Sequence, residues 1–91
     1  MFYIIAYDTP SDKRRRKMAK AILGFARRVQ KSVYEANLDR NEYIKMLENI
    51  ERVIDAKDDN VRIYGVPKDE VSNIAVYGSI PLVNNLDYEY S

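Results

Sequence analysis

Asp8 is the residue with the clearest potential for chemistry, because it ends an apolar stretch that runs from Phe2 to Tyr7. A stretch that is apolar at every position predicts a strand buried on both faces, in the middle of a sheet. A carboxylate at the carboxyl end of such a strand, just before a helix, lies where ligand sites of α/β structures gather. The same position also suits a carboxylate that only caps the helix and interacts with its dipole. Position alone leaves both roles open.

The cofactor that Asp8 could hold is Mg²⁺ or another divalent cation. Mg²⁺ prefers six oxygen ligands, usually one or two carboxylates together with water and substrate phosphates. A twofold axis near Asp8 would bring a second Asp8 from a partner subunit, and the metal could then activate water for phosphodiester hydrolysis. The chain contains no histidine and no cysteine, which excludes Ser-His-Asp and Cys-His catalysis and disfavours a structural zinc site. Hydrolysis of this kind therefore requires a homodimer.

Basic side chains are concentrated in the first third of the chain. Residues 1–34 have a net charge of +7, residues 35–91 have −6, and the whole chain has +1. The basic residues of the first segment are Lys13, Arg14, Arg15, Arg16, Lys17, Lys20, Arg27, Arg28 and Lys31. This asymmetry indicates either a surface that binds the phosphate backbone of a nucleic acid or an ordinary solvated helix face. Tyr7, Tyr34 and Tyr64 could stack on bases or simply pack in the core.

The elements that must position these residues follow from local patterns. Thr9 as N-cap, Pro10 at the first helical position and Asp12 predict a helix that runs to about Leu23, with Gly24 as its stop. Residues 27–38 predict two short strands that meet near residues 30–32. Asp39 begins a second capping box, and the helical period continues to residue 54. Strands are expected at residues 61–66 and 73–77.

The predicted order of elements is the split βαβ pattern of an α+β, ferredoxin-like βαββαβ fold with an additional C-terminal strand. A chain of 91 residues forms one domain, which we place at residues 1–77, followed by a tail at 78–91. We expect the last strand and the apolar tail to pair with the sheet edge of a second subunit. No basic leader precedes the first strand, and no run reaches about 18 apolar residues. A cytoplasmic protein without a membrane partner is therefore expected.

Three motifs give the chain its resemblance to a known family. Ile5 to Lys17 looks like a strand-one signature in which a Tyr-Asp pair precedes a basic helix. Arg28 to Glu35 and Asp58 to Tyr64 are similar to that family's middle and strand-four motifs. In this order and spacing, the motifs resemble the small CRISPR-associated endoribonuclease family, "Cas two", along almost the whole chain.

The resemblance implies roles for individual residues. Asp8 would be the metal ligand, paired with its mate across a dimer interface, and Tyr7 would act with it in catalysis. Tyr34 stands where many members have phenylalanine, and Lys17 stands where some have arginine, which keeps the charge but loses the bidentate fork. The residues expected to bind nucleic acid are Arg14, Arg15, Arg16, Lys17, Arg27, Arg28 and Tyr34.

The resemblance also implies a partner and a process. Members of the family pair with the CRISPR integrase, "Cas one", to insert foreign DNA as new spacers, and some are similar to metal-dependent nucleases of single-stranded RNA or double-stranded DNA. A non-catalytic DNA-binding scaffold for the integrase is the principal alternative. A toxin-like ribonuclease with the same fold is a further one, and a ferredoxin-like regulatory domain for small molecules ranks last. The sequence does not choose between RNA and DNA.

Overall fold

The computed structural model describes residues 1–82. Its elements follow one another as β1 (Phe2–Asp8), α1 (Asp12–Leu23), β2 (Arg27–Gln30), β3 (Val33–Asn37), α2 (Arg40–Val53), β4 (Asn60–Val66) and the 3₁₀ helix η1 (Lys68–Asn73). The four strands form one antiparallel sheet in the order β2-β3-β1-β4. This confirms the α+β, ferredoxin-like βαββαβ architecture, with β1 in the centre of the sheet as its apolar sequence predicts.

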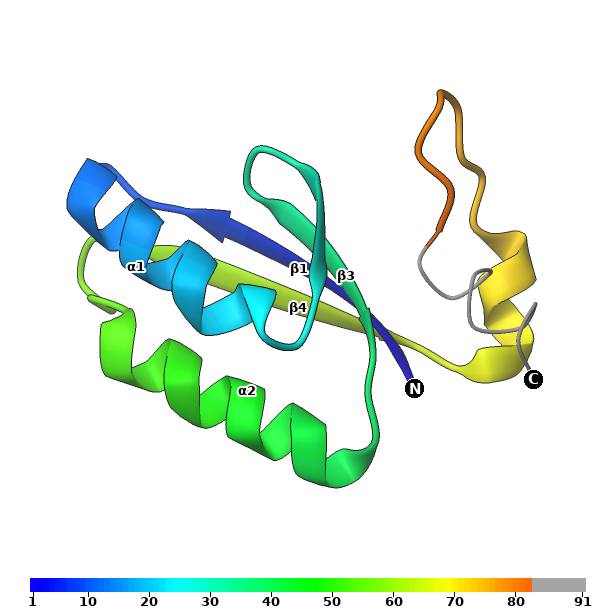
Figure 1. Ribbon diagram of the computed structural model, residues 1–91, viewed down its shortest axis with the longest axis horizontal. Coiled ribbons are helices and arrows are strands. Elements are labelled where there is room, and N and C mark those ends of the chain that lie inside the picture. Colours follow the sequence, from blue (N-terminus) through cyan, green and yellow to red (C-terminus); the bar gives the residue numbers. More distant parts are fainter. Residues whose placement is uncertain (83–91) are drawn as a thin grey trace.

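The main core lies between the sheet and the two helices, which cover the same face of the sheet (Figure 1). Side chains alternate along β1, so Ile5 and Tyr7 point toward the helices while Ile4, Ala6 and Asp8 point to the other face. Met18 and Ile22 of α1 pack in this core together with Met46 and Ile50 of α2, and these four side chains are buried. Burial of each such side chain stabilises the fold by about 1.5–3 kcal/mol.

The two helices begin in different ways. Asp39 caps α2 in the predicted capping box: its carboxylate accepts from the Glu42 backbone N–H at 2.8 Å, and its own N–H donates to the Glu42 carboxylate at 2.9 Å. The prediction that Thr9 caps α1 is wrong. Ser11 is the N-cap, and its hydroxyl oxygen accepts from the Arg14 N–H at 3.1 Å. The reason is that the Thr9 hydroxyl donates to Asp59 instead.

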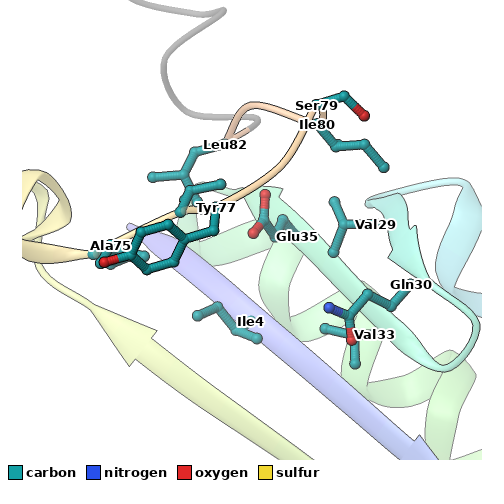
Figure 2. A pocket seen from close by; sticks show the side chains of 12 residues that line it. Ile4, Val29, Gln30, Val33, Glu35, Ala75, Tyr77, Ser79, Ile80 and Leu82 are labelled. Atoms are coloured by element: carbon teal, nitrogen blue, oxygen red, sulfur yellow. The ribbon is translucent and has the colours of Figure 1, made fainter.

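The face of the sheet that the helices leave open is partly covered by the C-terminal segment. Leu82 packs with Phe2 and Val71 in a second apolar cluster. Beside that cluster lies a groove of about 400 Å³ between the sheet, at Ile4 and Glu35, and residues 74–82 (Figure 2). The predicted fifth strand at residues 73–77 is not formed: Asn73 ends η1, and residues 74–77 have no ladder hydrogen bonds. These residues thus have no strand partner within their own chain, and their pairing with the sheet edge of a second subunit stays a prediction.

Two further predictions concern the C-terminal region and membranes. The predicted tail at residues 78–91 is described only as far as residue 82, and the rest lies outside the described residues. In the described range, neither helix is long and apolar enough to span a bilayer.

Candidate metal and nucleic-acid site

Asp8 lies at the end of β1 with its side chain on the open face of the sheet. The residue is exposed and pairs with Asn60 in the register between β1 and β4. A shallow cavity of about 270 Å³ surrounds it, and its polar lining includes Ser32, Asn60 and Arg62. No hydrogen bond or ion pair to the Asp8 carboxylate is found among residues 1–82. Its oxygens are therefore accessible to a ligand.

The donor set at this cavity is consistent with a hard cation but incomplete for one. Asp8 supplies a carboxylate of the kind that Mg²⁺ and Ca²⁺ accept, and Ser32 adds a hydroxyl, whereas the Asn60 Oδ1 already accepts a hydrogen bond from Arg62. No group of three or more acidic, histidine or cysteine side chains that could hold a metal occurs within residues 1–82. Further oxygens would have to come from water, from a phosphate or from a second Asp8.

Arg62 is the cation of the Asp8 cavity, and it was not among the predicted site residues. It is exposed on β4, and its Nε donates to the Asn60 Oδ1 at 3.3 Å. A guanidinium beside a carboxylate can orient a phosphate for attack. The signal was present in the sequence, because the strand-four motif from Asp58 to Tyr64 contains this arginine.

Tyr7 lies on the opposite face of the strand from Asp8. Its side chain is buried among the helices, and its hydroxyl donates to the Asp59 Oδ2 at 3.3 Å. Burial raises the pKa of the Tyr7 phenol, and the Asp59 carboxylate raises it further. Thus the structure places the Tyr7 hydroxyl beside Asp59 and not beside Asp8.

Asp59 is a buried carboxylate at the centre of a polar cluster that the sequence did not reveal. Its side chain is 0% exposed. The Arg14 Nε donates to Oδ2 at 2.8 Å and Nη2 donates to Oδ1 at 3.1 Å, while the Thr9 hydroxyl also donates to Oδ1. Hydrogen bonding from Arg14, helped by Thr9, holds the pKa of Asp59 well below its usual range despite burial. The strand-four motif contains Asp59 but does not reveal its role, because its side-chain partners are 45 to 52 residues away along the chain.

The three successive arginines of α1 have three different surroundings. Arg14 is paired with Asp59, and its own pKa is raised mainly by that hydrogen bond. Arg15 forms an ion pair with Asp12, and its Nη2 donates to the Thr9 carbonyl oxygen at 2.8 Å. Arg16 is exposed. Helix geometry separates successive side chains by about 100°, which explains the divergence.

A basic groove of about 350 Å³ lies between α1 and the β2–β3 hairpin. It is lined by Arg15, Arg16, Ala19, Lys20, Arg28 and Lys31. Arg28 stands over the Tyr34 ring at 5.5 Å from the centroid, and its Nη2 donates to the Tyr34 hydroxyl at 3.2 Å. Because Tyr34 faces the helices, the groove lies on the helix side of the sheet, and Asp8 lies on the open side.

The remaining predicted residues lie outside this groove. Lys17 is exposed on α1. Arg27 is partly buried, and its Nη2 donates to the Pro81 carbonyl oxygen. Tyr34 is only 3% exposed, so its ring packs in the core. The structure therefore gathers three of the predicted residues, Arg15, Arg16 and Arg28, into one groove and leaves the others outside it.

Comparisons of the sequence and of the fold with known proteins point to the same family. Residues 1–74 match the sequence model of the family described as CRISPR associated protein Cas2. A CRISPR-associated endoribonuclease Cas2 of Synechocystis is 32% identical over 80 residues, covering 88% of this chain and 87% of that protein. Another from Thermus thermophilus is 37% identical over 71 residues, covering 78% and 76%. The crystal structure of Streptococcus pyogenes Cas2 matches with a TM-score of 0.74 at 28% identity, covering 86% of this chain and 100% of that one.

Proposed function

The chain belongs to the CRISPR-associated Cas2 family, and from this membership we propose that it is a metal-dependent endonuclease that works as a homodimer in CRISPR adaptation. The observation that carries the proposal is the accessible Asp8 carboxylate at the end of β1, in one cavity with Arg62 and Asn60. The similar proteins named above are called endoribonucleases, and single-stranded RNA is therefore the first substrate to test, with double-stranded DNA beside it.

Asp8 and its neighbours would hold a divalent cation, Mg²⁺ or a similar ion, between two subunits. The ion would supply an activated water and stabilise charge on the leaving oxygen. Two Asp8 carboxylates satisfy the number that Mg²⁺ commonly takes from protein. Arg62 would bind a non-bridging phosphate oxygen and fix the scissile phosphate against the carboxylate pair. The chain has no histidine, so proton transfer would fall to water and to the phosphate itself.

Dimer formation through the open face of the sheet would bring the two Asp8 residues together. This face carries Asp8 and the half-exposed Tyr64 (50%) on neighbouring strands, and Ile80 of the C-terminal segment is also exposed (47%). Apolar side chains exposed in one chain gain stability when a second copy covers them. A small domain of this size also gains from association, because it buries less of its surface alone.

A second candidate function is a DNA-binding scaffold for the CRISPR integrase, and the basic groove favours it. The groove lies on the helix side of the sheet, away from Asp8. Lysine and arginine side chains there would contact phosphates without regard to sequence. A duplex held in this groove would be bound without being presented to Asp8, as a bridging subunit requires.

Cleavage of labelled single-stranded RNA and duplex DNA by the purified dimer tests both candidates. The reactions contain Mg²⁺ or a chelator, and the wild type is compared with Asp8→Asn and Arg62→Ala. A nuclease cleaves only with metal, loses cleavage in Asp8→Asn and keeps nucleic-acid binding in that variant. Tight, salt-sensitive DNA binding with no metal-dependent cleavage of either substrate would reject the nuclease and support the scaffold.

A further inference from the structure

We infer that Asp59 is a positioning residue that fixes the strand end carrying Asp8. The inference rests on the proposed function of Asp8 for its catalytic consequence, but its structural basis is independent of that function. Asp59 does not line the Asp8 cavity, and it would act through the residues on either side of Asp8.

The contacts of Asp59 reach both neighbours of Asp8. The Tyr7 hydroxyl donates to one carboxylate oxygen at 3.3 Å, and the Thr9 hydroxyl donates to the other. Thr9 is only 4% exposed, although it follows an exposed residue and precedes another. Asp8 thus lies between two residues whose side chains both donate to Asp59.

Further hydrogen bonds fix the Asp59 carboxylate in place. Arg14 binds both oxygens of Asp59 from the first turn of α1, and the Asp55 backbone N–H donates to Oδ2 at 3.0 Å from the loop after α2. These contacts join the start of α1, the end of β1 and the loop before β4. A carboxylate that accepts several hydrogen bonds, two of them from one guanidinium, has little freedom to rotate.

Beyond Tyr7, β1 is paired only with β4. The register with β3 ends at Ala6 and Val33, and one further bond joins the Tyr7 N–H to the Ser32 carbonyl at 2.9 Å. The register with β4 ends at the pair of Asp8 and Asn60. Strand ends with few ladder bonds open locally at low free-energy cost. The Asp59 cluster adds contacts from α1 and from the loop before β4 to the pairing with β4 at this end.

The use of Thr9 supports a positioning role. The sequence offers Thr9 as a cap for α1, but Ser11 performs that task, and the Ser11 N–H donates to the Thr9 Oγ1 at 3.2 Å. The Thr9 hydroxyl is thereby oriented as a donor to Asp59 rather than used for the helix. A site carboxylate has to be held within about 0.5 Å of its working position, and loss of such supporting groups commonly costs 10–100-fold in metal affinity or activity.

The test uses the full chain with two variants, Asp59→Asn and Thr9→Val. The first removes the charge that Arg14 binds, and the second removes one donor while keeping the side-chain shape. Amide hydrogen exchange at Asp8 and Tyr7 is measured by NMR, and broadening of the Asp8 signals by Mn²⁺ is titrated. Cleavage of single-stranded RNA is followed as kcat and KM. Asp39→Ala is the matched control, because it removes a carboxylate cap from α2, far along the sheet from Asp8.

A positioning role predicts faster exchange at Asp8, at least about fivefold weaker Mn²⁺ broadening and about 10–100-fold lower kcat with little change in KM in Asp59→Asn. Thr9→Val shows the same three changes to a smaller extent. Asp39→Ala lowers the Tm but leaves exchange at Asp8, Mn²⁺ broadening and kcat unchanged. If folded Asp59→Asn and Thr9→Val keep wild-type exchange and Mn²⁺ broadening at Asp8, the inference is wrong. If the wild type itself shows neither Mn²⁺ broadening at Asp8 nor cleavage, the proposed function fails, and the exchange data still decide whether Asp59 holds Asp8.

Discussion

Two aspartates at the same end of the sheet have opposite surroundings. Asp8 ends β1 on the open face, is exposed, and has no side-chain partner within the described residues. Asp59 precedes β4, has a buried side chain, and accepts hydrogen bonds from Tyr7, Thr9, Arg14 and the Asp55 backbone. Asp59 directly precedes Asn60, which is the register partner of Asp8. The exposed and the buried carboxylate therefore belong to residues that are near neighbours in the sheet.

The Asp8 carboxylate is available for ligands, whereas the Asp59 carboxylate stabilises the fold. A buried charge is tolerated only when it is paired and hydrogen-bonded, which leaves it no capacity for metal or substrate. An exposed carboxylate without partners contributes little to stability and keeps its oxygens free. Replacing Asp8 should therefore affect activity alone, and replacing Asp59 should affect stability first.

The largest expected effect is the loss of cleavage in Asp8→Asn. The amide keeps the shape but lacks the charge that a divalent cation requires, so metal-dependent cleavage should fall by at least about 100-fold. The Tm should stay within about 2 °C of the wild type, because Asp8 has no partner to lose. Initial rates of RNA cleavage and thermal unfolding of the same preparation measure both. A large drop in Tm would mean that Asp8 serves the fold and not the site.

Acid should reduce the contribution of Asp59 to stability. The pKa of Asp59 is lowered in the folded chain, while an unfolded aspartate titrates near 3.9. The stability that the lowered pKa of Asp59 provides is fully present above about pH 4. It is lost as the pH falls toward the pKa of Asp59 in the folded chain. The Tm difference between wild type and Asp59→Asn should thus be constant near neutral pH and shrink below about pH 4. A difference that stays constant down to pH 2 would contradict this linkage.

The fold could be read from sequence because its signals are local. The apolar run of β1, the capping box of Asp39 and the alternation around residues 30–32 each depend on neighbouring residues, and each prediction is confirmed. The Asp59 cluster could not be read, since it depends on contacts across 45 to 52 residues. The same holds for Thr9: a threonine before proline has the pattern of a helix cap, but the hydroxyl donates to Asp59, which precedes β4.

The candidate site was predictable in part. Asp8 stood out because it interrupts an apolar strand, and the structure leaves it exposed as the proposal requires. The grouping of basic residues was less predictable. Charge counting treats Arg14, Arg15 and Arg16 alike, whereas tertiary contacts occupy Arg14 and leave Arg16 exposed.

DNA binding should distinguish the exposed arginine from the paired one. In the double variant Arg16→Ala with Lys20→Ala, two cations of the basic groove are lost. The log–log dependence of duplex affinity on salt should then become shallower by about 1–2, at roughly 0.9 per phosphate contact. Arg14→Ala should leave that slope almost unchanged and lower the Tm, because Asp59 loses its ion-pair partner. Fluorescence anisotropy at several salt concentrations measures the slopes, and equal flattening by both variants would place Arg14 in the DNA interface.

The smallest expected effect belongs to Tyr7→Phe, which tests whether the tyrosine next to Asp8 takes part in the chemistry. Its hydroxyl is buried, makes a long 3.3 Å bond to Asp59 and lies on the opposite face of β1 from Asp8. Loss of one such bond costs about 0.5–1.5 kcal/mol of stability, and Thr9 and Arg14 continue to hold Asp59. Because Asp59 stays in place, the cleavage rate should fall by no more than about fivefold, which corresponds to roughly 1 kcal/mol in the activation free energy at 25 °C. A loss as large as that of Asp8→Asn, with the Tm unchanged, would show that Tyr7 reaches the reacting groups, and it would require the end of β1 to rearrange in the active protein.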